Sequence, residues 1–170
     1  MRAMAIGFCG ILAAGAIGVV AFGQGQAGRG EVRNTPAPKD KALSWTMAEM
    51  KTVDQELAAS KELTHRFFGE KGYNMEVRRL TGPQPILQHG KKSDFMVIQD
   101  GEGTFMSGGE LVNGKAGGED QGDLRGESIR GGVSKVLKPG DVMFVPAGVP
   151  HGFVATKDHV TFVMVRFDTR

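Results

Sequence analysis

The residues of this sequence that are best suited to chemistry are two histidines and one aspartate. His89 ends one apolar run and Asp94 begins the next, with the turn GKKS between them. His151 follows PAGVP, a turn whose prolines and glycine force the chain to reverse. If the strands beside these turns enclose one interior, two imidazoles and a carboxylate converge there. They then form a facial triad with open coordination positions for water, dioxygen or substrate.

Cysteine usage narrows the kinds of metal site that this chain can build. The single cysteine, Cys9, lies in the apolar run at the start of the chain. Once that run is removed there is no thiol, so a metal has to be held by histidine and carboxylate. Such ligands accept Mn, Fe, Co, Ni, Cu or Zn, and the sequence does not choose among these divalent ions. Two alternatives stay open: His65 as a fourth ligand, and His151 as a core histidine without metal.

Short apolar runs separated by turn residues fill the chain after about Leu63, a pattern typical of a sandwich or barrel of short strands. Two hairpins are expected, LTHRFF with YNMEVRRL around GEKG, and DFMVI with GTFMSGG around QDGE. The runs SKVL, DVMFV, HGFVA and VTFVMVRF complete the set. Alternation places His151, Phe153 and Ala155 on one face, which should be the inner one. The expected fold class is all-β.

One short helix is expected before the strands. In WTMAEMKTVDQELAASK, Thr46 and Glu49 form a capping-box pattern. Met50, Val53 and Leu57 recur at helical spacing, so this face should pack on the outside of the strands.

The polar, glycine-rich segment from Asn113 to Gly132 does not read as a strand. We interpret it as a long surface loop, with a flap over a barrel mouth as the alternative.

Residues 1–23 are expected to be a secretory signal peptide. Arg2 precedes a long apolar run, and Ala21 and Gly23 supply the small side chains that a signal peptidase reads. An uncleaved membrane anchor is the alternative, because the run approaches the roughly 20 residues that span a bilayer. A cleaved signal predicts a periplasmic or secreted protein with no stable membrane span.

Composition fits one globular domain with many tight turns. Residues 24–43 are rich in Gly, Pro and charge and read as a flexible linker, which leaves residues 44–170 as the folded domain with its preceding helix. Of the 170 residues 40% are hydrophobic and 26 are glycine, as short-stranded β proteins require. The formal charge of +2 is spread along the chain without a basic stripe, so nucleic acid is not an expected partner.

The two histidine segments together resemble the paired motifs of the cupin superfamily. The second family motif runs Gly, five residues, Pro-any-Gly, two residues, His, three residues, Asn. It is matched at every spacing up to the histidine by Gly140, Pro146, Gly148 and His151, and Ala155 stands at the position of Asn.

The first family motif is matched less completely. It contains His-any-His, three or four residues, Glu, six residues and Gly. His89 and Gly101 fit it, and Asp94 stands in place of Glu after a four-residue gap. Leu87 occupies the position of the first histidine, so one imidazole of the usual three-histidine, one-glutamate site is missing. The resemblance therefore implies either a site of two histidines and an aspartate, or a barrel that binds its ligand without metal.

The resemblance extends from about Leu63 to Phe167 and implies a double-stranded β-helix, the jelly-roll barrel of cupins. It implies a divalent metal bound by His89, Asp94 and His151 at the barrel mouth. The expected pocket around these ligands is lined by Leu87, Met96, Ile98 and Phe153. Such a lining favours a small, partly apolar ligand or substrate.

Several functions fit this resemblance. A metal-binding cupin could carry out dioxygenase, isomerase or lyase chemistry on a small organic substrate, and the fold alone does not choose among them or show that the chain is an enzyme. The alternative is a non-catalytic, metal-free module that binds a small molecule. A third reading is a structural partner in an envelope complex. By analogy with many cupins, a homodimer that joins barrel edges is also expected.

Overall fold

The structure is a computed structural model that describes residues 35–169, so the expected signal peptide and residues 24–34 of the expected linker lie outside it. The described elements are α1 (Met47–Ser60), β1 (Thr64–Glu70), β2 (Tyr73–Leu80), β3 (Ile86–Gln88), β4 (Lys92–Ser107), β5 (Glu110–Val112), β6 (Lys115–Ala116), β7 (Leu124–Gly126), β8 (Ser128–Arg130), β9 (Val133–Leu137), β10 (Val142–Val145) and β11 (His151–Asp168). Within residues 35–169, no helix combines the length and apolar character that crossing a membrane requires.

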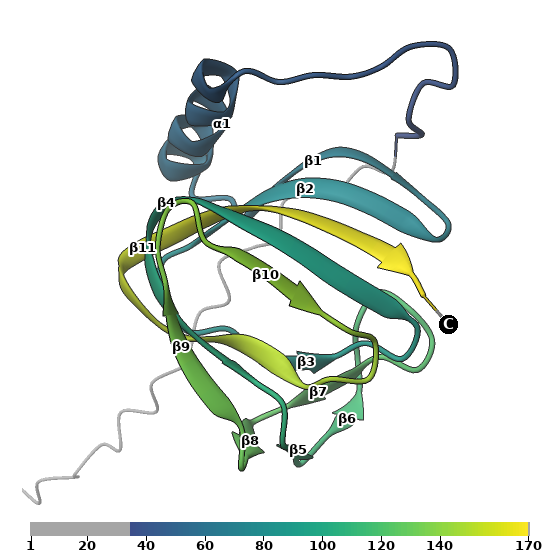
Figure 1. Cartoon of the computed structure of the whole chain (residues 1–170), viewed down its shortest axis with the longest axis vertical. Helices are drawn as coiled ribbons and strands as arrows, with labels where there is room; N and C mark the ends of the chain where they lie inside the picture. The colour runs from purple at the N-terminus through teal and green to yellow at the C-terminus, as the bar shows by residue number, and fades with distance from the viewer. Residues whose placement is uncertain (1–34, 170) are drawn as a thin grey trace, which may run out of the picture.

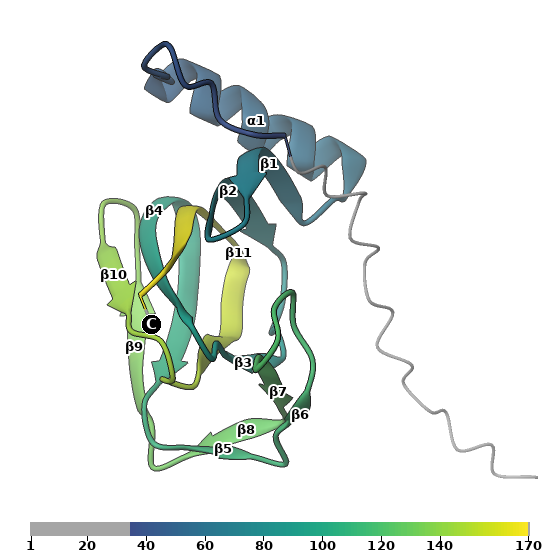
Figure 2. The same ribbon diagram turned by 90° about the vertical axis from the view of Figure 1, so that its right-hand side faces the viewer.

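The helix begins at the expected capping box, which is confirmed. Glu49 N donates to Thr46 Oγ1 at 3.2 Å, and Thr46 N donates back to Glu49 Oε2 at 2.7 Å. These two bonds satisfy backbone donors that a helix start otherwise leaves without partners. The helix α1 packs on the outside of β1 and β2, as Figure 2 shows. Its buried face consists of Met50, Val53 and Leu57, which contact Val77 of β2.

Two long strands, β4 and β11, form the centre of the sheet and run antiparallel along nearly their whole lengths. The hairpin expected around QDGE is therefore wrong, because the chain bends at Gly101 within β4 instead of reversing. Gly101 has a φ of +72°, and a Cβ at this position would lie 2.1 Å from the carbonyl oxygen of His159. Only glycine permits this close approach of the two strands, and the register shifts beside it mark a bulge.

The runs HGFVA and VTFVMVRF likewise form one strand, β11, rather than two. The inward-facing set expected there is correct only in part. His151 and Phe153 are buried, but Ala155 is exposed, because the register with β4 shifts between Phe153 and Ala155 and reverses the alternation.

A nine-stranded sheet curves around the interior, in the order β1-β2-β11-β3-β7-β6, and β4 joins it to β9 and β10 (Figure 1). A hydrophobic core fills the interior that the curved sheet encloses. It includes Leu80, Ile98, Phe105, Leu137, Phe153 and Phe162. The fold is all-β with one short helix, the jelly-roll barrel that the sequence predicts. The N-terminal hairpin, β1 with β2, is confirmed as well.

The segment from Asn113 to Gly132 is not the unstructured surface loop that we expected. It contains β6, β7 and β8; β7 pairs with β3, and β8 pairs with β5. Short strands form here because they satisfy backbone groups at the edge of the sheet. Between β6 and β7 the chain folds inward, so that Asp123 is only 3% exposed.

Candidate metal centre

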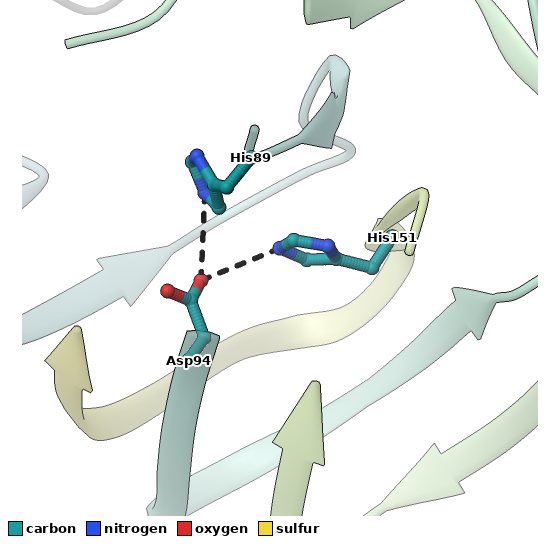
Figure 3. A group of neighbouring side chains, drawn as sticks. All are labelled: His89, Asp94 and His151. Carbon is teal, nitrogen blue, oxygen red and sulfur yellow. Dashed lines mark ion pairs between the residues drawn. The ribbon is translucent and has the colours of Figure 1, made fainter. Parts of the chain in front are cut away.

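His89, Asp94 and His151 meet in the interior from three different elements (Figure 3). His89 follows β3, Asp94 lies near the start of β4, and His151 begins β11. The Nε2 atoms of His89 and His151 lie 3.6 and 3.3 Å from the same oxygen, Asp94 Oδ2. All three residues are buried, and one ligand atom from each lies within 4.8 Å of the others.

Backbone contacts between the two turns bring these residues together. Gly148 N donates to His89 O at 2.7 Å, and Ala147 N donates to Ser93 Oγ at 3.1 Å. The turn before His151 is thereby bonded to the segment that carries His89 and Asp94. Gly148 adopts a φ of +86°, a conformation that side chains other than glycine rarely accept.

The second nitrogen of each imidazole has an acceptor that sets its orientation. His151 Nδ1 lies 2.9 Å from the carbonyl oxygen of Val149, and His89 Nδ1 lies 3.0 Å from Asp123 Oδ2. Because a carbonyl and a carboxylate only accept, both Nδ1 atoms donate, and the lone pair of each neutral ring is then on Nε2. Within the described part of the chain, His89 Nε2 is buried and has no hydrogen-bond partner. The donor set therefore fits a cation between the two Nε2 atoms and Asp94.

Protonation of the site also fits metal ligation. Burial lowers the pKa of His89, and the positive charge of Arg166 lowers it further, so its ring is kept neutral. Burial alone would raise the pKa of Asp94, but the charge and hydrogen bonds of the Arg166 guanidinium hold that pKa well below its usual range. The pKa of Asp123 is lowered too, because its bond with His89 and the backbone N–H groups of Gly90 and Asp120 together outweigh its burial. Neutral imidazole and ionised carboxylate are the forms that bind metals.

Arg166 places a buried positive charge directly against Asp94. Its Nε lies 2.7 Å from Asp94 Oδ1 and its Nη2 lies 3.0 Å from Asp94 Oδ2, and both side chains are buried. The pair arises because Arg166 stands directly opposite Asp94 in the β4–β11 register and thus shares its face of the sheet. Asp94 Oδ2 keeps one lone pair for the imidazole side, so Asp94 can offer a single ligand atom to a metal.

Two small cavities flank the three residues. One is lined by His89 together with Arg78, Leu87 and Arg166, and the other by Asp94 and His151 together with the same three residues. Of the residues expected to line the pocket, Leu87, Met96 and Phe153 face the second cavity. Ile98 is 2% exposed and packs in the core, outside the residues that line either cavity.

Sequence reasoning missed Asp123 and Arg166. Asp123 lies in the segment that we read as a surface loop, and its role depends on a contact across 34 positions of sequence. Two further contacts hold this loop over the interior, Lys92 Nζ to Asp120 Oδ2 at 2.8 Å and Arg66 Nη2 to Glu119 Oε2 at 3.1 Å. For Arg166 a signal was available, because it continues the inward alternation Phe162, Met164, Arg166 along the last strand.

The remaining histidines lie elsewhere. His65 lies on β1, where its ring packs edge-on against Phe67 with centroids 4.9 Å apart, so it is not a fourth ligand of this group. His159 lies at the bend of β11 and forms a second group with Asp54 and Asp100, outside the barrel interior.

Comparison with known proteins agrees with this fold. A family model described as Cupin matches residues 89–170, which include all three residues of the centre. No curated protein matches the sequence. A Bacillus halodurans protein, BH2720, has 8% identity and a TM-score of 0.53, with coverage of 80% of this chain and 88% of that one.

Two other solved structures are similar at lower scores. A proposed mannose-6-phosphate isomerase from Ralstonia eutropha JMP134 has 16% identity and a TM-score of 0.45, with coverage of 63% and 84%. A cupin 2 conserved barrel domain protein from Rhodopseudomonas palustris has 16% identity and a TM-score of 0.44, with coverage of 63% and 61%. At these identities the likeness concerns the fold alone.

Proposed function

Because the chain belongs to the cupin superfamily, we propose that it binds a divalent transition metal ion through His89, Asp94 and His151 and acts on a small organic substrate. One observation supports this most strongly. Both Nε2 atoms point toward Asp94 Oδ2, while each Nδ1 is already bonded to an acceptor of the protein. Imidazoles held in this way are typical of metal ligands with an ordered second layer.

A metal held by three protein ligands supplies a Lewis acid with open positions for a substrate oxygen. The chain's own residues would do the rest. Asp123 and the Val149 carbonyl keep both rings in the tautomer that ligates, and Leu87 and Phe153 exclude water from the substrate side. Dioxygenase, isomerase and lyase chemistries all fit such a centre.

Elemental analysis of the purified protein tests the proposal. We expect one equivalent of metal per chain, and we expect it to be lost in a His89→Ala, His151→Ala double variant. His65→Ala and His159→Ala are matched controls, since they remove the other two histidines, and both should keep the metal. A protein that retains the metal in the double variant would show that the ion binds elsewhere.

A second candidate is a non-catalytic, metal-free binding module. The bond between Arg166 and Asp94 favours it, because it gives the buried carboxylate a counter-charge without any ion. The two candidates separate in one experiment. Ligand binding that survives complete chelation, in a protein that purifies without metal, supports the module.

We propose that the chain is exported to the periplasm or secreted. Support comes from the sequence of residues 1–23 alone, with its basic start, apolar run and small-residue exit. Mass spectrometry of the protein recovered from cell fractions tests this. We expect an N-terminus near residue 24 in the exported fraction; an intact N-terminus in the membrane fraction would support an anchor instead.

We also propose a homodimer that covers the outer face of β10. Val142 and Phe144 are 54% and 53% exposed there, and Phe95 of the neighbouring β4 is 38% exposed. Among the described strands, β10 pairs with β4 only, so its other edge is open. Analytical ultracentrifugation should show a dimer that Phe144→Lys disrupts and Val133→Lys, an exposed control on β9, does not. A monomeric wild-type protein would contradict the dimer.

A further inference from the structure

The cavity beside His89 is lined by three arginines, Arg78, Arg125 and Arg166, and by two glutamates, Glu76 and Glu119. Both glutamates are engaged by a fourth arginine, since Arg66 Nη2 lies 2.8 Å from Glu76 Oε2 and 3.1 Å from Glu119 Oε2. The negative charge of this wall is thus already shared with a buried cation. Arg78 Nε also lies 3.9 Å from Glu76 Oε1, and Arg166 is paired with Asp94. Four arginines, counting Arg66 and Arg125, therefore surround three carboxylates here.

Arg166 supplies a donor that the protein does not use. Its side chain is 4% exposed, and its Nε and Nη2 are bonded to Asp94. Within residues 35–169, Arg166 Nη1 makes no hydrogen bond. This atom is not fully buried either. Because Arg166 lines both cavities, this nitrogen is available to an acceptor that enters them.

Charge in the interior points to an anionic ligand. Arg166 already balances the negative charge of Asp94. Asp94 would therefore offset little of the positive charge of a divalent ion at the proposed centre. Arg78 lines the same space from β2 and adds a further positive charge. An anion placed between the ion and these guanidinium groups would interact favourably with both in a weakly screened interior.

The second cavity is apolar on its far side. Met96, Phe105, Phe153, Phe162 and Met164 line it, and each is at most 3% exposed. The cavity beside His89 has a volume of about 20 Å³, and the second cavity has a volume of about 30 Å³. A ligand of only a few heavy atoms therefore fits, with an apolar part in the second cavity.

We propose that the substrate or ligand of this site is a small monocarboxylic acid. Its carboxylate binds Arg78 and Arg166 next to the centre, and its short apolar part lies among Met96, Phe105 and Phe162. This inference rests on the proposed function for the charge of the ion, and it adds the chemical class that the site recognises. Arginine suits this role because its planar donors match the two oxygens of a carboxylate.

The test is a titration of the full chain with butyrate, butanamide and inorganic phosphate, in zinc-loaded and in chelator-treated protein. Carbon-13 methyl labels on methionine locate the binding, since Met96 and Met164 line the apolar cavity. We expect butyrate to shift both resonances and to bind at least tenfold more tightly than its neutral isostere butanamide. Phosphate should bind more weakly than butyrate and leave both methyl resonances in place.

Two variants make the result specific. Arg78→Gln should weaken butyrate binding about tenfold, as expected for a lost charge-assisted hydrogen bond. Arg130→Gln, which removes an arginine whose side chain is 72% exposed, should leave the affinity unchanged. Equal affinity for butyrate and butanamide, unchanged binding in Arg78→Gln, or phosphate as the tighter ligand would each overturn the proposal.

Zinc content, measured on the same samples, separates the two claims. Protein that holds zinc but does not distinguish butyrate from butanamide refutes the carboxylate site and leaves the metal site standing. Protein that holds no zinc refutes the metal site. The ratio of butyrate to butanamide affinity in the chelator-treated sample then decides the carboxylate site by itself.

Discussion

Among residues 35–169, two groups of histidine and aspartate bring their ligand atoms equally close together, but the groups differ in burial and in hydrogen bonding. The inner group is His89, Asp94 and His151, and the outer group is Asp54, Asp100 and His159. In each group one ligand atom per residue lies within 4.8 Å of the others. The inner group is buried, whereas Asp100 of the outer group is exposed.

The ligand atoms of the outer group already have partners. Arg79 Nη1 and Thr161 Oγ1 donate to Asp54 Oδ1 at 2.7 and 2.5 Å. Both nitrogens of His159 contact carboxylates, with Nδ1 3.0 Å from Asp158 Oδ2 and Nε2 3.3 Å from Asp100 Oδ2. In the inner group, by contrast, His89 Nε2 is buried without a hydrogen bond. Closeness of ligand atoms is thus insufficient, and an oriented lone pair without a competing partner distinguishes the inner group.

The largest difference between the groups should appear when their arginines are removed. Arg166→Met leaves Asp94 buried without its partner, so we expect the metal-free protein to lose about 3–5 kcal/mol of unfolding free energy. Arg79→Met breaks the pair with Asp54, which is more accessible to water, and should cost about 1 kcal/mol. Denaturant unfolding with chelator present measures the loss of unfolding free energy in both variants. Equal losses would contradict the difference in burial between the two ion pairs.

The second contrast concerns orientation of the imidazoles. Asp123→Ala removes the acceptor of His89 Nδ1 and should weaken metal binding about 10- to 100-fold, the usual effect of losing such a partner. Asp158→Ala removes the equivalent partner of His159 and should leave the affinity unchanged. Competition against a chromophoric chelator gives both constants. Unchanged affinity in Asp123→Ala would mean that His89 needs no support.

A smaller effect is expected at the helix that carries Asp54. Thr46→Ala removes the capping box of α1 and should lower the unfolding free energy by about 1 kcal/mol. Because α1 packs outside the barrel, metal affinity should not change. A loss of metal in this variant would show that the helix supports the inner group after all.

The smallest effect concerns pH, and its direction follows from His89. Burial and then Arg166 lower its pKa below 6.5, so the unfolded chain binds a proton at a pH where the folded protein does not. Above pH 6.5 neither state is protonated and the shift has no effect on stability. As the pH falls through 6.5 toward the lowered value, stability is lost. With chelator present, His89→Gln should reduce the dependence of the unfolding free energy on pH, and His159→Gln should leave it unchanged. The same dependence in the wild type and both variants would contradict this role of His89.

Local patterns in the sequence were sufficient for several features. The capping box at Thr46 was predictable because it depends on two residues three positions apart. The turn before His151 was predictable because Pro146 fixes its own φ and Gly148 accepts the positive φ that the turn requires. The convergence of His89, Asp94 and His151 was expected only on the condition that their strands enclose one interior, and the resemblance to the paired cupin motifs supported that condition.

Features that depend on distant contacts were not predictable in this way. QDGE has the composition of a hairpin turn, yet β4 continues through it. The chain bends here instead of reversing, because β4 pairs with β11 on both sides of Gly101. Asp123 is polar and surrounded by glycines, and only its contact with His89 distinguishes it from a loop residue. Pairing of Asp94 with Arg166 depends on a register that spans 72 positions.

The most direct measurement is the position of a zinc ion in crystals of the full chain, located by anomalous scattering at the zinc edge. The account predicts one strong peak about 2.0–2.1 Å from Nε2 of both His89 and His151, and about 2.0–2.2 Å from an oxygen of Asp94. A peak at Asp54, Asp100 and His159, with none between the two inner imidazoles, would contradict it.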